Sequence, residues 1–290
     1  MTSLRRVLLK KLVARRPTHA LRLASERLHV FGVHLRLDAG SPLYQAGAGE
    51  SIELPLDDVI APIVLAKGRW QTEELDFIGA HQPQRCVLID VGANIGLITR
   101  QMLHRLPGIE AAVCFEPHPG NFRFLERNLA HLPQCHLVQA AVGAAEGELR
   151  FYEETGNIGN YSLNLDAMRG KQYRTSVVKC VRADEAHLLG PLPQSLRSLP
   201  LVWKSDTQGF DELVMTHLTD DFWSRVHAGV MEIWRIERPA FDRDRLGRIL
   251  GQFAVRRFGD APERNVPVDE VLHYSSGVDY QHRDLFFARA

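Results

Sequence analysis

The 290-residue sequence lacks an excess of charge of either sign, because 35 Lys and Arg residues balance 35 Asp and Glu residues. A protein that coats nucleic acid needs a basic excess to neutralise phosphates, so we expect no nucleic-acid partner. A disordered acidic chain is excluded too, because 45% of the residues are hydrophobic and only 24% are charged. The composition therefore predicts a folded chain with ample core.

Cysteines and long apolar runs are scarce as well. Cys86, Cys114, Cys135 and Cys180 lie far apart, which excludes a zinc knuckle or a redox pair and indicates buried thiols in a reducing compartment. No His, Asp and Glu residues have the spacing of metal ligands, so we predict no metal site. No apolar run reaches the ~18 residues that span a membrane. We expect a cytoplasmic protein.

The first sixteen residues contain six basic residues and no acidic one, and their apolar positions recur at helical spacing. One interpretation is a start helix that packs on the domain with its charges in water. The other is a basic helix in weak peripheral contact with an anionic membrane surface, at the inner face of the membrane. We expect residues 1–65 to form this helix and a cap, with strands over 29–39 and 49–56, and residues 66–290 to form the main domain.

From residue 85 onward, apolar runs alternate with helical patterns. Strands are expected over 85–92, 111–117, 135–143, 200–209, 229–237, 252–259 and 283–290. Helices are expected over 57–81 (with a proline interruption), 95–106, 121–132 and 211–226, and a β-hairpin over 148–153 and 176–182. This alternation is typical of βαβ units and a mainly parallel sheet, which binds ligands at the carboxyl ends of its strands.

The first of these strands runs into a glycine loop, DVGANIG, from Asp90 to Gly96. Its glycines are four residues apart, unlike the G-x-G-x-x-G loop of dinucleotide-binding proteins. Asp90 at the strand end would repel a pyrophosphate and would suit a ligand whose nearby end carries an ammonium and a sulfonium. S-adenosylmethionine is such a ligand. The alternative interpretation is a tight turn between strand and helix.

A second acidic residue follows the loop at a spacing that is typical of a nucleoside-binding site. Glu116 ends the next strand, twenty residues after Gly96. A carboxylate at this place accepts hydrogen bonds from both ribose hydroxyls of a bound nucleoside. The alternative is a surface acid that caps the following helix.

Four ordered segments carry a resemblance to a known family: DVGANIG, FEPHPGNFRFLERNL, AAVGAAEGELRFY and KSDTQGFDELVM. Over roughly residues 85–240 the chain resembles the FkbM family of S-adenosylmethionine-dependent methyltransferases. The resemblance implies a class I methyltransferase (Rossmann-like) α/β fold, a mainly parallel seven-stranded sheet whose last strand is antiparallel. It also implies methyl transfer to a hydroxyl of a sugar, glycolipid or secondary metabolite, that is, an O-methyltransferase.

The resemblance further implies which residues hold the cofactor S-adenosylmethionine. Glu116 would bind the ribose and Ala141 would lie near the adenine. The residues implied at the methionine end are Asp90, Gly92, Ala93, Asn94 and Gly96. The sequence departs from the family pattern in two places, since Ser205 replaces an apolar residue and Asp211 replaces a glutamate.

The segment from Lys204 to Asp206 is where we expect catalysis. These two residues are two apart on a strand, so they point to the same face. Asp206 would meet the acceptor hydroxyl and remove its proton, while Lys204 would hold Asp206 ionised and oriented. The alternative is a structural Lys–Asp pair that fixes the following loop. Two nearby residues are weaker candidates: Tyr161 as part of a lid over the acceptor, and Glu237 as an acid at the same edge.

Two other functions remain open from the sequence. One is a nicotinamide-dependent oxidoreductase on a similar sheet, against which the glycine spacing and Asp90 count. The other is a non-catalytic, methyltransferase-like binding module, against which the intact Glu116 and Asp206 count. We expect the acceptor to be a small molecule or glycan, whose pocket is built from loops and the N-terminal cap.

Overall fold

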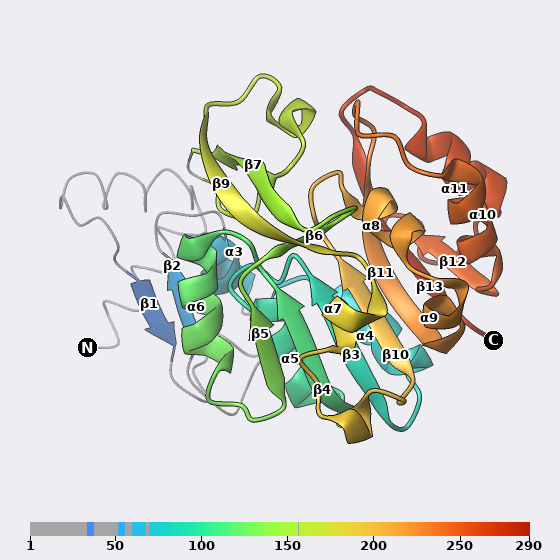
Figure 1. The fold of residues 1–290 in the computed structure, drawn as a ribbon, viewed down its shortest axis with the longest axis horizontal. Coiled ribbons are helices and arrows are strands. Elements are labelled where there is room, and N and C mark those ends of the chain that lie inside the picture. The colour runs from blue at the N-terminus through green and yellow to red at the C-terminus, as the bar shows by residue number, and fades with distance from the viewer. Residues whose placement is uncertain (1–33, 38–51, 56–59, 68–69, 156) are drawn as a thin grey trace.

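The computed structural model describes residues 34–37, 52–55, 60–67, 70–155 and 157–290. Its centre is a seven-stranded sheet in the order β12-β13-β11-β10-β3-β4-β5 (Figure 1). The strands are β3 (Cys86–Val91), β4 (Ile109–Phe115), β5 (Cys135–Val138), β10 (Leu201–Ser205), β11 (Val226–Trp234), β12 (Val255–Phe258) and β13 (His282–Ala288). β13 is antiparallel to both of its neighbours, and the other neighbouring pairs are parallel. The predicted class I methyltransferase fold is confirmed.

Helices cover both faces of this sheet. One face carries α4 (Thr72–His81), α5 (Leu97–Arg105) and α6 (Pro119–Leu129). The other carries α7 (Glu185–Leu189), α8 (Asp211–His217), α9 (Asp220–Arg225), α10 (Arg243–Gly251) and α11 (Val268–Ser275). Because both faces are covered, a central strand is apolar on both sides. In β3, Val87 and Ile89 face one layer and Leu88 faces the other, and all are fully buried.

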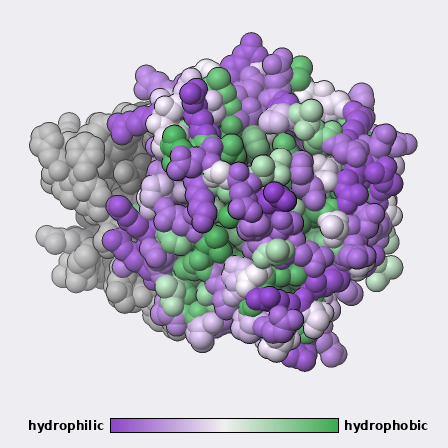
Figure 2. All heavy atoms as spheres, in the orientation of Figure 1, coloured by the Kyte–Doolittle hydropathy of each residue, from purple (hydrophilic) through white to green (hydrophobic). Residues whose placement is uncertain are grey.

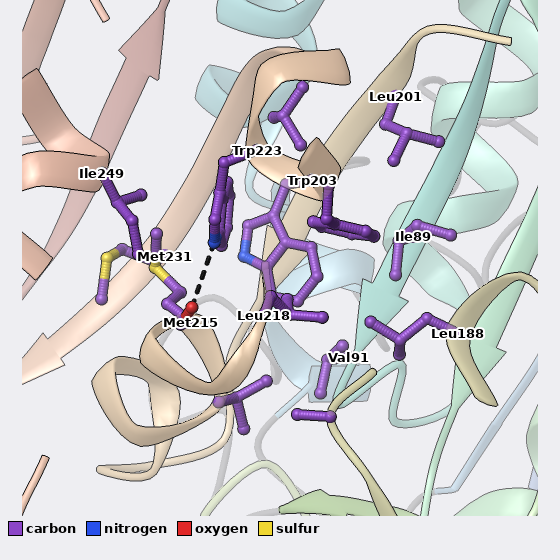
Figure 3. Close-up of a cluster of buried hydrophobic side chains, with 14 of the residues drawn as sticks. Ile89, Val91, Leu188, Leu201, Trp203, Met215, Leu218, Trp223, Met231 and Ile249 are labelled. Carbon is purple, nitrogen blue, oxygen red and sulfur yellow. Dashed lines mark hydrogen bonds between the residues drawn. The ribbon is translucent and has the colours of Figure 1, made fainter. Parts of the chain in front are cut away.

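The layer that includes α8 and α9 packs on a cluster of large aromatic side chains (Figure 3). Trp203 of β10 and Trp223 of α9 are fully buried, with ring centroids 5.3 Å apart in an edge arrangement. The indole nitrogen of Trp223 donates a hydrogen bond of 3.0 Å to the carbonyl of Met215, so its one polar group is satisfied. These contacts fix α8 and α9 against β10, the strand that leads to Asp206.

A small second sheet lies above the large sheet in Figure 1 and supplies loops to its carboxyl edge. It has the order β6-β9-β7-β8, with β6 (Ala141–Gly143), β7 (Gly147–Glu154), β8 (Tyr161–Ser162) and β9 (Tyr173–Arg182). β7 and β9 pair antiparallel, which confirms the predicted hairpin. The single strand predicted over 135–143 is wrong. A turn closed by the N–H of Ala140 on the carbonyl of Val138 sends β5 into the large sheet and β6 into the small one.

Two helix predictions are also corrected. The helix predicted over 211–226 is two helices, because Thr219 ends the first run and caps α9, its hydroxyl accepting the N–H of Phe222 at 3.1 Å. The region 57–81 forms two helices, α3 (Ile60–Lys67) and α4, and the break between them follows Lys67. The proline is not the cause, because Pro62 lies in the first turn of α3, where a missing N–H is tolerated. Sequence patterns missed α7, α10 and α11. Short 3-10 turns span Leu165–Met168 and Gln194–Leu196.

The N-terminal part is described only in pieces. β1 (His34–Leu37) pairs antiparallel with β2 (Ile52–Pro55), and Ile52 and Leu54 are buried in a cluster with Ile95 and Leu97. The boundary expected after residue 65 falls inside α3, so a separate cap domain stays a prediction. Residues 1–16, with their predicted helix and membrane contact, lie outside the described residues.

The surface in view is mostly polar. Figure 2 shows hydrophilic side chains over most of this face, with apolar ones scattered between them. Within the described ranges, the large apolar side chains that are exposed are Leu165, Tyr173, Val177 and Val278. None of the helices in those ranges has the length and apolar character needed to cross a membrane.

Thr219 provides a test of the break between α8 and α9. We expect Thr219→Ala to lower the free energy of unfolding by about 1 kcal/mol, the usual cost of losing an N-cap hydrogen bond. Urea unfolding measures it. Ser224→Ala, on the exposed side of the same helix, is the matched control and should change stability by less. Equal stability of Thr219→Ala and the wild type would contradict the capping role.

Candidate functional site

The loop after β3 adopts left-handed backbone angles at three positions. Gly92 and Gly96 have φ of 81°, and Asn94 has φ of 52°. A Cβ on Gly92 would lie 2.0 Å from the backbone oxygen of Asp206, and one on Gly96 would lie 2.8 Å from a methyl of Leu125. Close approach of the Asp206 backbone thus requires glycine at position 92 in addition to its φ angle, whereas at Gly96 the φ angle is the main constraint because the leucine side-chain ends can shift.

Two adjoining cavities lie at the carboxyl ends of the central strands. The first, of about 570 Å³ including space open to solvent, lies between the ends of β3 and β4 and the small sheet. The second, of about 1060 Å³ counted in the same way, extends from the glycine loop toward α4 and β13. The residues that line both cavities are Gly92, Asn94, Gly159, Asp206 and Gln208. A ligand in one cavity would therefore meet a ligand in the other beside Asp206.

Glu116 lines the first cavity at the end of β4. Its two carboxylate oxygens accept the backbone N–H groups of Asn94 and His118, each at 2.9 Å. Burial raises the pKa of Glu116 to about 7, although these two hydrogen bonds lower it. Each oxygen keeps a lone pair for one more donor. The carboxylate is therefore held rigidly, with capacity for two hydroxyl groups of a ligand.

The rest of the first cavity is largely apolar. Ala141, Phe151 and Tyr161 line it, and the ring centroid of Tyr161 lies 4.7 Å from that of His118 in an edge arrangement. Tyr161, expected in a lid over the acceptor, thus belongs to the cavity that contains Glu116. A flat apolar slot beside a buried carboxylate suits the base and ribose of a nucleoside.

Asp90 and Lys204 form a buried ion pair behind the glycine loop. The Lys204 ammonium lies 3.0 Å from Asp90 Oδ1 and donates to the Gly92 carbonyl at 2.9 Å. Thr99 of α5 donates to the other Asp90 oxygen. Burial alone would lower the pKa of Lys204, but Asp90, Asp206 and Glu74 together raise it above its ordinary value. Both side chains of the pair are almost completely buried.

This pair changes two expectations. Asp90 lines neither cavity, so the expected direct contact with the methionine end of a ligand is replaced by support of the loop from behind. Lys204 makes its direct ion pair with Asp90 and not with Asp206, because β10 and β3 are in parallel register with Lys204 opposite Asp90. Lys204 also lines the second cavity. Gly96 lines neither.

Asp206 lies just beyond β10, where the two cavities meet. Its Oδ1 accepts the side-chain amide of Gln208 at 2.6 Å, and the same amide nitrogen donates to Glu232 Oε2 at 2.7 Å. Glu232 is a buried residue near the carboxyl end of β11, and the indole of Trp234 also donates to it. Burial, followed by the charge of Asp206, raises the pKa of Glu232 well above its ordinary value. Two carboxylates on neighbouring strands therefore share one amide.

Hydrogen bonds to Asp211 fix the loop that follows Asp206. Its carboxylate accepts the backbone N–H and the hydroxyl of Thr207, at 3.2 and 2.8 Å. Burial and the nearby Asp206 raise the pKa of Asp211 to about 7. The shorter acid at this departure from the family pattern thus closes the turn into α8.

The second cavity is lined mainly by polar side chains. Glu154 lies 3.3 Å from Lys171 and also accepts the amide of Asn160. The carbonyl oxygen of that amide is buried and accepts no hydrogen bond from the described residues. Trp234 stacks on His282, with ring centroids 4.6 Å apart. Within the described ranges, no group of three or more His, Cys, Asp or Glu side chains has an arrangement that holds a metal ion.

Sequence reasoning missed Gln208 and Thr99, and it did not place Glu232 next to Asp206. These residues could not be placed without the strand order, which the sequence does not show. In the sheet, Ser205 pairs with Met231, so Asp206 and Glu232 lie next to each other at the carboxyl ends of adjacent strands. Glu237, expected at this edge, lines neither cavity, and its backbone is bound by Asn164 and Asp166.

The residues present fit S-adenosylmethionine. Glu116 has capacity for the ribose hydroxyls, and Ala141 lies in the apolar slot. Ala93 lines the second cavity, and the side-chain oxygen of Asn94 is buried at the border of the two, with no donor among the described residues. An unsatisfied buried acceptor is costly, and a ligand N–H or O–H would satisfy it.

Comparisons with known proteins give a likeness of structure only. No family model matches the chain, and no curated protein matches it. A 23S rRNA methyltransferase, ErmE, aligns over 77% of this chain and 69% of its own, with 11% identity and a TM-score of 0.37. Methyltransferase FkbM from Methylobacillus flagellatus KT aligns over 79% of this chain and 52% of its own, with 10% identity and a TM-score of 0.38.

An rRNA methylase from Streptococcus thermophilus is similar over 74% of this chain and 93% of its own, with 8% identity and a TM-score of 0.37. At these values the likeness carries no conclusion about family, activity or acceptor. Membership of the FkbM family stays a prediction.

The buried ion pair gives a stability prediction. We expect Lys204→Met to lower the free energy of unfolding by about 3–5 kcal/mol, because it leaves Asp90 charged, buried and uncompensated. Arg105→Met is the matched control, since Arg105 makes an exposed pair with Asp76 at 2.8 Å and should cost about 0–1 kcal/mol. Urea unfolding of both variants decides. A Lys204→Met protein as stable as the control would show that the pair does not hold the site together.

Glu116 gives a pH prediction. Because burial raises its pKa from 4.5 to about 7, the folded protein keeps a proton that the unfolded chain releases between these values. This group therefore stabilises the fold less as pH rises through that range. Ribose hydroxyls bind best to the ionised form. We expect S-adenosylhomocysteine to bind about tenfold more tightly near pH 8 than near pH 6, with proton release on binding.

Calorimetry in buffers of different ionisation enthalpy measures both quantities. Glu116→Gln keeps the size and removes the titration, so its weaker affinity should not vary over this pH range. A wild-type affinity that is also constant with pH would contradict the ribose assignment.

Proposed function

We propose that the protein is an S-adenosylmethionine-dependent methyltransferase that acts on a hydroxyl group, with the nucleoside of the cofactor in the first cavity and the acceptor in the second. The observation that carries this proposal is the position of Asp206, which lines both cavities where they meet. A base at that border is within reach of an acceptor oxygen that approaches a reactive group held in the first cavity.

In this proposal the cofactor contacts are made by residues of the first cavity, by residues of its border with the second cavity, and by Ala93, which lines the second cavity. Glu116 accepts the ribose hydroxyls, and Ala141 and Phe151 enclose the adenine. Gly92, Ala93 and Asn94 line the methionine end. Asp90 acts through Lys204, which holds the Gly92 carbonyl and hence the loop.

The chemistry asks little of the protein beyond placement and one proton. The cofactor supplies a methyl group on a sulfonium, and the S–CH₃ bond breaks as the O–CH₃ bond forms. Asp206 takes the hydroxyl proton, so the acceptor leaves uncharged. Gln208 holds the carboxylate in place, and the apolar first cavity keeps water away from the reacting end.

The second cavity favours an acceptor rich in hydrogen-bond donors. Glu154, Asp206 and the buried oxygen of Asn160 all accept hydrogen bonds and line it. Such a lining suits a sugar, a glycolipid headgroup or another polyol. Carboxylates repel phosphates, which supports the expectation that nucleic acid is not the acceptor.

One observation bears on the oxidoreductase alternative. The described residues that line the first cavity include Glu116 and Asp206 but no Lys, Arg or His. A dinucleotide would bring its pyrophosphate to uncompensated carboxylates. Thermal shift with S-adenosylhomocysteine and with a nicotinamide dinucleotide separates the two, since only a ligand of the folded state raises the midpoint.

The proposal is tested with methyl-labelled S-adenosylmethionine and two acceptor sets, uncharged sugars and polyols in one and short RNAs in the other. We expect label in the first set. Asp206→Asn should lower the rate by about 10²–10⁴ and leave S-adenosylhomocysteine affinity unchanged. Asp260→Asn, at an exposed pair with Arg283, is the matched control.

Two results would count against the proposal. Labelling of RNA alone would overturn the acceptor class. An Asp206→Asn protein with normal turnover would remove Asp206 from its role as base.

A further inference from the structure

Gln208 has a backbone conformation that its side chain does not favour. Its φ is 55°, in the left-handed region that residues with a Cβ seldom adopt. It is also 7% exposed, in the turn between β10 and α8. Unfavourable backbone angles persist where the surrounding contacts over-determine them, and they concentrate at functional sites.

The side chain of Gln208 bridges two acids. Its one amide nitrogen donates to Asp206 Oδ1 at 2.6 Å and to Glu232 Oε2 at 2.7 Å. An amide nitrogen has two hydrogens, so it satisfies one oxygen of each carboxylate. Without it the two acids would face each other with no donor between them, and like charges at this distance repel strongly in a buried setting.

The backbone of Gln208 is held from the small sheet. Ser162 of β8 donates its hydroxyl to the Gln208 carbonyl at 2.7 Å and is fully buried. The same hydroxyl accepts the N–H of Asn164 at 2.8 Å, so it has one orientation. Gln208 is thereby fixed at both ends, by Ser162 at the backbone and by two carboxylates at the side chain.

Other charges face Asp206 from every element packed around it. Lys204 of β10 is the cation among them, and it already pairs with Asp90. The remaining groups are Glu74 of α4, Asp211 of α8, Glu232 of β11, and His282 and Asp284 of β13. Asp206 therefore lies in a strongly acidic setting, in which a neutral donor such as Gln208 keeps the nearest acid separate.

We propose that Gln208 is a positioning residue: it holds the Asp206 carboxylate at the border of the two cavities and apart from Glu232, and Ser162 of the small sheet sets its place. The inference rests on the proposed function, because it needs Asp206 beside the reactive end of the cofactor. It adds that Gln208 connects β8, which lines the first cavity, with the Asp206 carboxylate, so the position of one depends on the other.

The test compares two probes that differ in charge at the reactive centre. S-adenosylhomocysteine has a neutral sulfur there, and sinefungin has an ammonium on carbon. A charged, well-placed Asp206 favours sinefungin. We expect the wild type to prefer sinefungin about tenfold or more by calorimetry, and Asp206→Asn to lose the preference while it still binds S-adenosylhomocysteine.

Gln208→Met is the decisive variant, since it keeps the length and removes the bridge. Without the shared donor, the Asp206 carboxylate loses the hydrogen bond that holds it at the border of the two cavities. We therefore expect Gln208→Met to lose most of the roughly tenfold preference for sinefungin while it still binds S-adenosylhomocysteine as the wild type does. Asparagine tolerates the left-handed angle but is too short to span both acids. Gln208→Asn should therefore show the same change in sinefungin preference as Gln208→Met, and it replaces that variant in the test if Gln208→Met does not fold.

Ser162→Ala tests the link to the small sheet and should reduce the sinefungin preference by a smaller amount than Gln208→Met does. Ser176→Ala is its matched control, because the Ser176 hydroxyl of β9 donates to Glu153 of β7 inside the small sheet, and it should leave the preference unchanged.

Each negative result has a distinct meaning. A Gln208→Met protein with the wild-type preference for sinefungin would overturn the positioning role alone. An equal loss of affinity for both probes would reduce Gln208 to a structural residue and overturn it as well. A wild type that binds neither probe would overturn the proposed function itself.

Discussion

The buried ion pair between Asp90 and Lys204 is the constraint on which the site depends. The parallel register of β3 and β10 places the two residues opposite each other, on the face of the sheet that packs against α4, α5 and α6. The cost of burying both charges is offset only if the remaining polar atoms are satisfied, and Thr99 and the Gly92 carbonyl do this. The pair therefore joins α5, the glycine loop and the end of β10 into one unit.

That unit explains why the loop contains glycine at position 92. The N–H of Asp206 donates to the Val91 carbonyl at 3.0 Å, which brings the backbone beyond β10 across the loop and leaves no space for a Cβ on Gly92. Asp206 and the loop are consequently placed by the same contacts. A glycine usually attributed to close approach of a ligand is here required first by close approach of the protein to itself.

Much of the fold could be predicted from the sequence, because local patterns decide it. The alternation of apolar runs and helices yielded the parallel sheet, and the places of Asp90, Glu116 and Asp206 at strand ends followed from it. What failed depended on non-local facts. The register between two strands that are far apart in the chain decides the ion-pair partner of Lys204. A turn at Ala140, which leads from one sheet to the other, divides residues 135–143 into two strands. Gln208 belongs to no recognisable sequence motif, because its proposed positioning role depends on its backbone angle φ and on contacts with residues that are distant in the sequence.

Three carboxylates at one sheet edge are kept distinct by different means. Glu116 is bound by two backbone N–H groups, Asp206 by a side-chain amide, and Glu232 by that amide and an indole. Burial, followed by the charge of Asp206, raises the pKa of Glu232 well above that of an ordinary glutamic acid. The three carboxylates are thus held by three different sets of donors, although they lie at the same edge of the sheet.

The small sheet then contributes more than a wall. β8 supplies Tyr161 to the first cavity and, one residue later, Ser162 to the carbonyl of Gln208. Asn164 continues the contact by donating to the carbonyl of Glu237 beyond β11 at 2.8 Å. Any displacement of this sheet that opens the first cavity would thus pull on the residues beyond both β10 and β11. Under the proposed function, enclosing the nucleoside and aligning Asp206 are therefore not separate events, because the same short strand carries the residues for both.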